Sequence, residues 1–458
     1  MFPPTDSVSR RRWLQTTSAG FGYLAFAGLA TEAAAKDAPA SPLAPKAPHF
    51  PARAKRVIFL CMRGGPSHIE MFDHKPKLAA DHGKPAKAKN AKLLGPRWKF
   101  AQHGQSGQWL SELLPHTAKL ADQLCVLKGM HTDNENHPQA LELMHTGSFQ
   151  FVRPSMGSWV VYGLGSENRS LPGFVSINPL TALGGMRYYS SAFLPAAYSA
   201  TMIGDANAPG KGQSVGNLRN PRLTAEGQRK QLDLLQAMNR GLATETADPR
   251  IEGAIESFEL AFRMQAEFPK VMDVAGESKD TLAMYGIGKG PTNTFGTQCL
   301  LARRLVESGV RFVEVTHTDW DHHGFLSRLM PQKCSEIDQP VAGLLTDLKQ
   351  RGLLNDTLVV WGGEFGRTPD DATQDGRGHN SKGFSMWMAG GGVNGGTSYG
   401  ATDDYGYEAI EGKVHTHDLH ATILHLLGLD HEKLTFRYGG RDFRLTDVHG
   451  RVVTEVLA

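Results

Sequence analysis

The sequence has little cysteine and almost no excess of charge of either sign. Its four cysteines (Cys61, Cys125, Cys299 and Cys334) lie far apart without a CxxC pair, which argues against a zinc knuckle or a thioredoxin-type redox site. The 49 Lys and Arg residues nearly balance 46 acidic residues, and no basic stripe marks the body of the chain, so nucleic-acid binding is not expected. The 51 glycines and 25 prolines exclude a coiled coil. What remains is the composition of a globular chain of 458 residues, which is long enough to bury a large core.

The first 35 residues have the layout of an export signal. Residues 9–15 read SRRRWLQ, a Gly- and Ala-rich apolar stretch follows over 16–30, and alanines then offer a small-residue cleavage site. The apolar stretch is shorter than the roughly 20 residues that span a bilayer. The consecutive arginines resemble the twin-arginine signal, which exports folded proteins. We therefore predict a signal peptide over 1–35 and an Ala-, Pro- and Lys-rich linker over 36–54; a basic amphipathic anchor is the alternative.

The rest of the chain alternates between short apolar runs and stretches of helical periodicity. Continuous apolar runs predict buried strands at 57–62, 124–127, 310–315, 358–361 and 384–388. Helical spacing predicts helices at 113–120, 138–145, 293–307, 337–348 and 417–427, and two helices within 224–268 that break near Asp248-Pro249. This alternation predicts an α/β fold, a mostly parallel central sheet with helices on both faces. We expect one domain over 55–458 with a largely helical insertion near 180–290.

Polar side chains follow the predicted strands at the points where the strands end. In chain order they are Ser67, His68 and Asp73, then Thr132 and His137, then Asp319, Asp321 and His323, and then Glu364, Arg367 and His379. Open parallel sheets bind ligands outside the carboxyl ends of their strands. We therefore expect these side chains to meet at one edge of the sheet, although hundreds of residues separate them.

The residue types at these strand ends indicate metal chemistry. Imidazole with carboxylate is the ligand set of zinc, manganese or iron, and carboxylates alone also suit calcium or magnesium. The most specific local candidate for a metal-binding pair is Asp319 or Asp321 together with His323. A short turn can direct the carboxylate and the imidazole at one ion. Two such ions roughly 4 Å apart can hold the attacking and leaving oxygens of a phosphoryl-type transfer. Arg367 either stabilises an oxyanion or forms a salt bridge.

Two other reaction types lack their sequence signals. The glycines at 390–392 are not followed by the Lys and Ser/Thr of a phosphate-binding loop, so no nucleotide cofactor is predicted. No G-x-S-x-G motif occurs, which disfavours an esterase of the α/β-hydrolase type.

Several long motifs resemble one bacterial family. They are GGPSHIEMFDHKP, HTDNENHPQALELMHTGS, WDHHG, DTLVVWGGEFGRTP, GRGHNSKGFSMWMAGGGVNGG and HDLHATILHLLGLDHEKLTFRYGGRDFRLTDVHG. Together they resemble the family called domain of unknown function 1501 over nearly the whole chain from Arg56. Because that family is grouped with the alkaline phosphatase and sulfatase superfamily, the resemblance implies an alkaline phosphatase-like fold, and it implies export by the twin-arginine route.

The resemblance also implies roles for single residues at the strand ends. The stretch over 144–147 resembles the sulfatase stretch that ends in LLTG, and this places His137 at the position of the nucleophile. Glu364 takes the place of a late metal-binding Asp, and His379 the place of a later metal-binding His. Asp319 or Asp321 with His323 resembles the first metal site of the phosphatases.

The chain departs from the superfamily pattern at two places. Arg63 and Gly64 stand where the first-strand carboxylates are expected, which leaves Ser67, His68 or Asp73 as substitutes. No Cys stands at position 137 in a CxPSR context, so formylglycine cannot form there. Thr132 is then a displaced nucleophile, or His137 itself attacks or binds metal.

These observations predict an exported, metal-dependent hydrolase of phosphate, sulfate or related esters. Its substrate would be a small-molecule or polysaccharide ester, and its cofactor a divalent metal such as Zn, Mn, Ca or Mg. We expect it in the periplasm or cell envelope, where it meets the membrane only through export. The alternative, from a different class, is a non-catalytic binding or scaffold protein that keeps the fold.

Overall fold

The computed structural model describes residues 41–181, 184–207, 215–216, 218–246, 248–288, 290–371 and 373–458. The predicted signal peptide and the first part of the predicted linker lie outside these residues. Residues 42–458 form one compact unit. Among the described helices, none combines the length and the apolar character needed to cross a membrane.

Residues 42–54 pack against the body of the protein. The Lys46 amide donates to the Leu164 carbonyl at 2.9 Å, and the amides of Arg53 and Ala54 donate to the Leu426 carbonyl at 2.9 and 2.8 Å. Leu43 and Ala54 are buried in the core. The backbone of this part of the predicted linker thus has hydrogen-bond partners that composition alone does not reveal.

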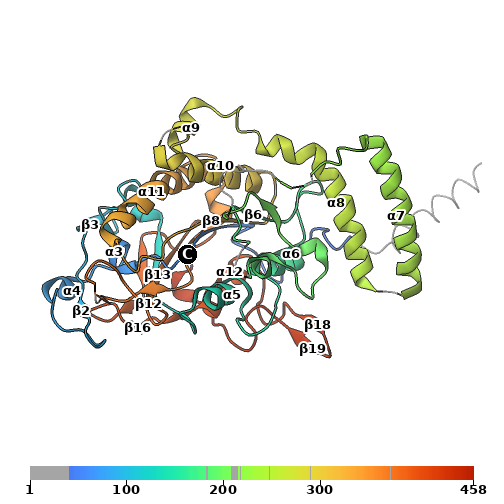
Figure 1. Ribbon diagram of the computed structural model, residues 1–458. Helices are drawn as coiled ribbons and strands as arrows, with labels where there is room; N and C mark the ends of the chain where they lie inside the picture. Colours follow the sequence, from blue (N-terminus) through green and yellow to red (C-terminus); the bar gives the residue numbers. More distant parts are fainter. Residues whose placement is uncertain are drawn as a thin grey trace, which may run out of the picture. The chain divides into compact units, whose positions relative to one another are not determined.

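A nine-stranded sheet forms the centre of the compact unit (Figure 1). Its order is β14-β5-β13-β9-β1-β8-β6-β7, with β17 beside β5. Strands β1 (Arg56–Met62), β8 (Phe312–His317), β9 (Thr357–Gly362), β6 (Phe174–Ile177) and β7 (Thr201–Ile203) run parallel. Strand β13 (Phe384–Ala389) is antiparallel to both of its neighbours, β9 and β5 (Cys125–His131), so β5 runs in the same direction as β9. Strands β14 (Thr397–Tyr399) and β17 (Val414–His415) are parallel to β5.

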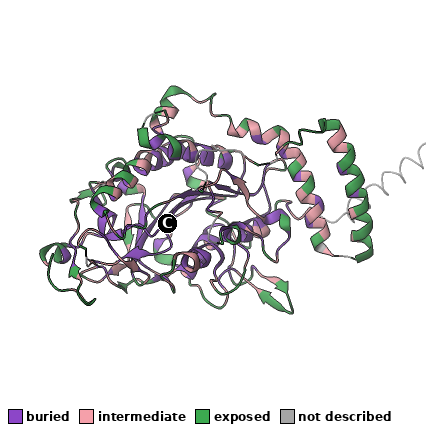
Figure 2. Ribbon diagram, viewed as in Figure 1, coloured by how far each residue is buried: buried purple, intermediate pink, exposed green. Residues whose placement is uncertain are grey.

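Helices cover both faces of this sheet, as the sequence predicted. In Figure 1, α10 (Asn293–Glu307) and α11 (Leu326–Gln350) lie on one side of the strands, and α5 (His137–Thr146), α6 (Met156–Leu164) and α12 (Thr416–Leu426) lie on the other. The strands between them are buried (Figure 2). Strands that are covered on both faces need continuous apolar runs, which is why those runs predicted the sheet. The mostly parallel α/β fold is thus confirmed.

Shorter elements complete the chain. The helix predicted over 113–120 is instead a 3-10 helix, η1 (Thr117–Gln123). The other short helices are α3 (His68–Met71), α4 (Pro76–Ala80), α9 (Lys279–Met284), η2 (Gly185–Tyr189), η3 (Ala196–Tyr198), η5 (Gly290–Thr292), η6 (Leu354–Asp356) and η7 (Thr454–Val456). Two-stranded pairs are formed by β2 (Lys92–Leu93) with β11 (Asp370–Asp371), β3 (Phe100–His103) with β4 (Gln108–Ser111), β10 (Gly366–Arg367) with β12 (His379–Asn380), β15 (Ala401–Thr402) with β16 (Ala409–Glu411), and β18 (Phe436–Tyr438) with β19 (Arg441–Phe443).

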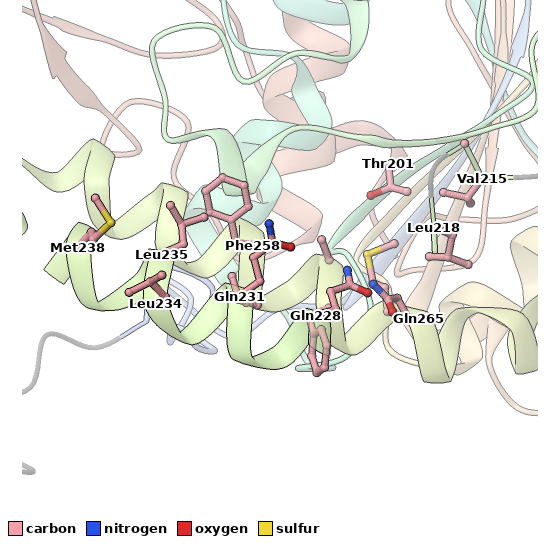
Figure 3. Close-up of a pocket in the computed structure, with 15 residues that line it drawn as sticks. Thr201, Val215, Leu218, Gln228, Gln231, Leu234, Leu235, Met238, Phe258 and Gln265 are labelled. Carbon is pink, nitrogen blue, oxygen red and sulfur yellow. The ribbon is translucent and has the colours of Figure 1, made fainter. Parts of the chain in front are cut away.

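The predicted insertion contains a hairpin of two long helices, α7 (Ala225–Thr246) and α8 (Pro249–Met272). The Asp248 side chain caps α8 by accepting from the Arg250 amide at 2.9 Å, which explains the break between the helices. A cavity of about 620 Å³ lies along this hairpin and is lined by apolar side chains such as Leu235, Met238 and Phe258 (Figure 3). None of the predicted site residues lines this cavity.

Candidate metal centre

The loops that follow the parallel strands leave from one edge of the sheet. Strands β1, β5, β8 and β9 share one direction, so their carboxyl ends lie at the same edge. Strand β13 runs the opposite way, and the segment that precedes it, which includes β12, therefore also lies at this edge. Residues from three connections between strands of the sheet meet here: His137 after β5, Asp321 and His323 after β8, and Glu364, Arg367 and His379 between β9 and β13.

One carboxylate lies at the centre of three imidazoles. Asp321 Oδ2 is 3.3 Å from His137 Nε2, and Asp321 Oδ1 is 3.1 Å from His323 Nε2 and 3.3 Å from His379 Nε2. The Nε2 atoms of His323 and His379 are 2.9 Å apart. We call His137, Asp321, His323 and His379 the Asp321 cluster. One atom from each of His137, Asp321 and His379 lies within 4.8 Å of the other two, close enough for one metal ion.

Two of the imidazoles are anchored through their other nitrogen. His137 Nδ1 is 2.6 Å from Glu364 Oε1, and His379 Nδ1 is 2.6 Å from the Glu135 carbonyl oxygen. Both partners are acceptors, so the Nδ1 atoms carry hydrogens, and the Nε2 atoms of both rings face Asp321. Histidines that bind metals are held in this way, with one nitrogen on the ion and the other on a carboxylate or a carbonyl.

Glu364 stands behind His137, which differs from its predicted place as a direct ligand. Its side chain is fully buried, and its two carboxylate oxygens accept from the Gly64 amide at 3.0 and 3.1 Å. A Cβ atom at Gly64, whose φ is +115°, would lie 2.7 Å from the Trp320 backbone nitrogen, so only glycine fits this turn. Glu364 therefore orients the His137 ring from the side opposite to Asp321.

Arg367 fixes the loops around Asp321. Its buried guanidinium donates to the Gly65 carbonyl at 2.8 Å, to the Arg377 carbonyl at 3.1 Å and to Asp321 Oδ1 at 2.6 Å, and it also donates to the Gly64 carbonyl. The guanidinium of Arg367 is therefore hydrogen-bonded to protein groups. Of the two predicted roles, the geometry fits the salt bridge and not the oxyanion donor.

Hydrogen bonds within the cluster shift the pKa values of His137 and Asp321 in opposite directions. Burial lowers the pKa of His137, but the hydrogen bonds to Asp321 and Glu364 outweigh it and raise the pKa to about 9. Burial would raise the pKa of Asp321, yet the bonds from His137, His379 and Arg367 hold it far below its usual range. Asp321 is therefore ionised, and the site holds a proton on His137 that a metal ion would have to displace.

The remaining predicted residues lie outside this cluster. The Asp319 side chain is 71% exposed and faces Lys333 Nζ at 3.5 Å, so of the two aspartates only Asp321 reaches the imidazoles. The buried His68 contacts the Gly406 carbonyl through Nε2 at 3.2 Å, and Asp73 pairs with Lys75 at 2.9 Å.

The hydroxyls of Ser67 and Thr132 are buried and have no hydrogen-bond partner among the described residues. Ser67, predicted as a substitute ligand, and Thr132, predicted as a displaced nucleophile, therefore form no hydrogen bond with the Asp321 cluster in this structure.

Three parts of the site were not predicted. They are the Gly64 amide, the Glu135 carbonyl and the ring of Phe365, whose centroid is 4.8 Å from that of His137 and 4.7 Å from that of His379. The two backbone groups have no sequence signal, because every residue carries an amide or a carbonyl. The ring of Phe365 packs against the imidazoles of His137 and His379.

Residues 54–457 match a family model described as a protein of unknown function, DUF1501. The chain belongs to this family. No curated protein matches it.

Among solved structures, this DUF1501 protein is similar to the lipoteichoic acid synthase LtaP from Listeria monocytogenes, with 10% identity, 88% of this chain and 78% of that chain covered, and a TM-score of 0.40. It is also similar to a protein in the alkaline phosphatase superfamily from Vibrio parahaemolyticus, with 11% identity, 92% and 75% coverage, and a TM-score of 0.37. A third is the PsFucS1 sulfatase from Pseudoalteromonas sp., with 12% identity, 83% and 68% coverage, and a TM-score of 0.38. At these identities and TM-scores the likeness assigns no activity and no residue role.

Proposed function

We propose that this protein is an exported hydrolase of phosphate, sulfate or related esters that uses a divalent metal ion at the Asp321 cluster. The observation that carries the proposal is the convergence of three imidazole Nε2 atoms on one ionised carboxylate, with two of the rings fixed from behind. A metal ion that displaced the protons between these groups would be held by the imidazole nitrogens and the carboxylate together.

The ligand types narrow the choice of ion. Three imidazoles and one carboxylate suit zinc or manganese, whereas calcium and magnesium prefer oxygen ligands throughout. When bound, such an ion lowers the pKa of a coordinated water towards neutrality and neutralises charge on a transferred group. Small-molecule or polysaccharide esters remain the substrate class that we propose, and the periplasm or cell envelope the compartment.

The residues around the proposed ion have different roles. Glu364 holds the Nδ1 hydrogen of His137, and Glu135 holds that of His379 through its carbonyl. Arg367 keeps Asp321 ionised and fixed in place. The His323 side chain is 54% exposed, so it marks the side of the cluster that is open to a substrate.

One observation favours the second candidate, a binding protein with a structural ion. The Asp321 cluster contains no hydroxyl or thiol, and among the described residues the hydroxyls of Ser67 and Thr132 form no hydrogen bond with it. An enzyme built on this cluster would therefore attack with water and not with a side-chain hydroxyl.

Metal analysis followed by an activity panel tests the proposal. The protein is purified without chelator, its bound metal is counted by mass spectrometry, and it is then assayed on aryl phosphate, phosphodiester and aryl sulfate. We expect at least one equivalent of zinc or manganese and hydrolysis of at least one ester that stops when the metal is removed. Bound metal with no hydrolysis in the whole panel would favour the binding protein, and the absence of metal would overturn both.

A further inference from the structure

A second group of ionisable side chains lies inside the core, apart from the Asp321 cluster. It consists of Cys61 on β1, His145 near the end of α5 and Glu314 on β8, all of them buried, with atoms within 4.8 Å of one another. Burying charge in a core is costly unless the charge is paired, so this group needs a physical explanation.

His145 forms an ion pair with Glu314 inside the core. His145 Nδ1 is 2.7 Å from the Leu141 carbonyl oxygen, and His145 Nε2 is 3.1 Å from Glu314 Oε1. Both nitrogens face acceptors, so both carry hydrogens in this structure. Burial lowers the pKa of His145, but the charge and hydrogen bond of Glu314 outweigh it and raise the pKa.

Cys61 stays a neutral thiol beside this pair. Burial, together with the charge of Glu314, raises the pKa of the thiol well above its usual value. A thiol is a poor metal ligand compared with a thiolate. The Asp321 cluster contains no thiol, and the Nε2 atoms of its two anchored rings, His137 and His379, face the Asp321 carboxylate.

The ion pair lies on the helix that carries His137. Helix α5 begins at His137, which contacts Glu364, and ends one residue after His145, which contacts Glu314. The two histidines are eight residues apart, about 12 Å along the helix axis. Both acids are fully or almost fully buried and belong to the sheet or its edge, so α5 is fastened to the sheet near both of its ends.

The His145–Glu314 ion pair affects the position of α5 on the sheet more than the stability of the protein. A buried ion pair adds little stability compared with apolar side chains of the same size, but it is satisfied in only one register of the helix on the sheet. The apolar neighbours Leu141 and Met144 are buried too, but their contacts are not directional, whereas the hydrogen bond is. Glu314 also lies on the strand that leads directly to Asp321, so the pair links the two elements that carry His137 and Asp321.

We propose that His145 and Glu314 are positioning residues that set the distance between His137 and Asp321 and thereby tune metal affinity at the Asp321 cluster. The inference rests on the proposed metal site. Outer partners of metal-binding histidines change metal affinity 10- to 100-fold when they are removed, and this pair acts one step further out.

The test compares Glu314→Gln with a matched variant on the other face of the sheet. In Glu314→Gln the amide keeps the shape and an acceptor, but the charge is lost. Glu277→Gln serves as the control, because Glu277 forms ion pairs with Arg303 at 2.7 Å and Arg304 at 2.5 Å, both on α10. In Figure 1, α10 and α5 lie on opposite sides of the strands.

We expect zinc affinity, measured by competition with a chelating dye, to fall about 10-fold in Glu314→Gln and to stay unchanged in Glu277→Gln, with both variants folded. Hydrogen exchange of the metal-free protein should become faster across residues 137–146 in Glu314→Gln only. The double variant His145→Gln/Glu314→Gln can form a neutral hydrogen bond in the same place, and we expect it to recover part of the affinity.

Three outcomes would overturn the inference. The first is a folded Glu314→Gln protein with the affinity and the exchange rates of the wild type. The second is an equal loss of affinity in Glu277→Gln, which would show a general effect of destabilisation. The third is a second equivalent of metal that disappears in Cys61→Ser, which would make the buried group a metal site. If the wild type binds no ion, the proposed function fails, and hydrogen exchange over 137–146 still decides whether the pair positions α5.

Discussion

Asp319 and Asp321 are two residues apart and chemically identical, yet only one of them belongs to the site. Asp319 has φ of +71° and turns its carboxylate outwards to Lys333, whereas Asp321 points inwards and accepts from Arg367. The tight turn between them places the two side chains on opposite sides. At this scale the functional difference comes from backbone direction and from the charge that each carboxylate meets.

Replacing Asp321 should abolish metal binding. Asp321→Asn removes the only carboxylate at the centre of the three imidazoles, so we expect loss of bound zinc or manganese and of any ester hydrolysis that depends on it. The measurement is the metal content of the purified variant beside the wild type. Asp319→Asn, at an exposed side chain two residues away, should keep both metal and stability; loss of metal there would contradict the assignment of Asp321.

Replacing Glu364 should weaken metal binding without removing a ligand. In Glu364→Gln the His137 ring loses the charged acceptor that fixes its Nδ1 hydrogen, and we expect a 10- to 100-fold lower metal affinity. Glu135→Gln is the matched control, since Glu135 holds His379 through its backbone carbonyl, which the substitution leaves in place. Equal affinities in Glu364→Gln and the wild type would show that Glu364 does not orient His137.

At the scale of elements, α5 connects the sheet to the site. Pro138 follows His137 in the first turn, where its missing amide is not needed by the helix. The helix ends at Gly147, whose φ is +70° and whose amide donates to the Leu143 carbonyl at 2.9 Å. The helix predicted over 138–145 agrees with the observed helix to within one residue at each end.

Gly147→Ala should destabilise the protein through the end of this helix. A Cβ atom there would lie 2.0 Å from the Leu445 carbonyl oxygen, and alanine also disfavours the positive φ. We expect the free energy of unfolding to fall by at least about 1 kcal/mol, because the native backbone does not accommodate the new side chain. Urea denaturation of the variant and the wild type measures this difference in the free energy of unfolding. Gly241→Ala, within α7 and with open space where the new methyl group would lie, should instead be neutral or stabilising.

At the scale of the whole molecule, buried neutral histidines make stability depend on pH. Burial lowers the pKa of His420 to about 3 and that of His68 to about 4. In the unfolded chain both titrate near 6.5, so as the pH falls below that value the unfolded state takes up protons that the native state does not. The stability that these neutral histidines contribute is fully present above pH 6.5 and is lost as the pH falls from 6.5 to about 4 for His68 and to about 3 for His420.

We therefore expect the free energy of unfolding to decrease from pH 6.5 to pH 4, by up to about 1.4 kcal/mol per pH unit for each fully buried histidine. Chemical denaturation at several pH values gives the slope. His420→Gln keeps a donor for the Met144 carbonyl and should reduce the slope. An unchanged slope in that variant would show that His420 is not among the groups responsible.

The strands of the central sheet could be predicted from the sequence because each depends on a short run of apolar residues. The runs at 57–62, 124–127, 310–315, 358–361 and 384–388 predicted all five of the strands that correspond to them, since a strand buried on both faces has no polar side. The helix prediction at 113–120 was less accurate, because a short apolar stretch does not distinguish a 3-10 helix from an α-helix.

The sequence by itself determined an α/β protein whose chemistry-bearing side chains follow its strands, because hydrophobic periodicity and strand ends are local properties of the chain. Only the tertiary structure decided which of those side chains meet. In the tertiary structure Asp321 and not Asp319 faces the imidazoles, Glu364 lies behind His137, and Arg367 is hydrogen-bonded to the loops around Asp321. The hydrogen bonds among the described residues do not join Ser67, His68 or Thr132 to the cluster. The reason is physical: a distance of about 3 Å between groups hundreds of residues apart is set by loop backbones and buried hydrogen bonds, and these leave no periodic trace in the sequence.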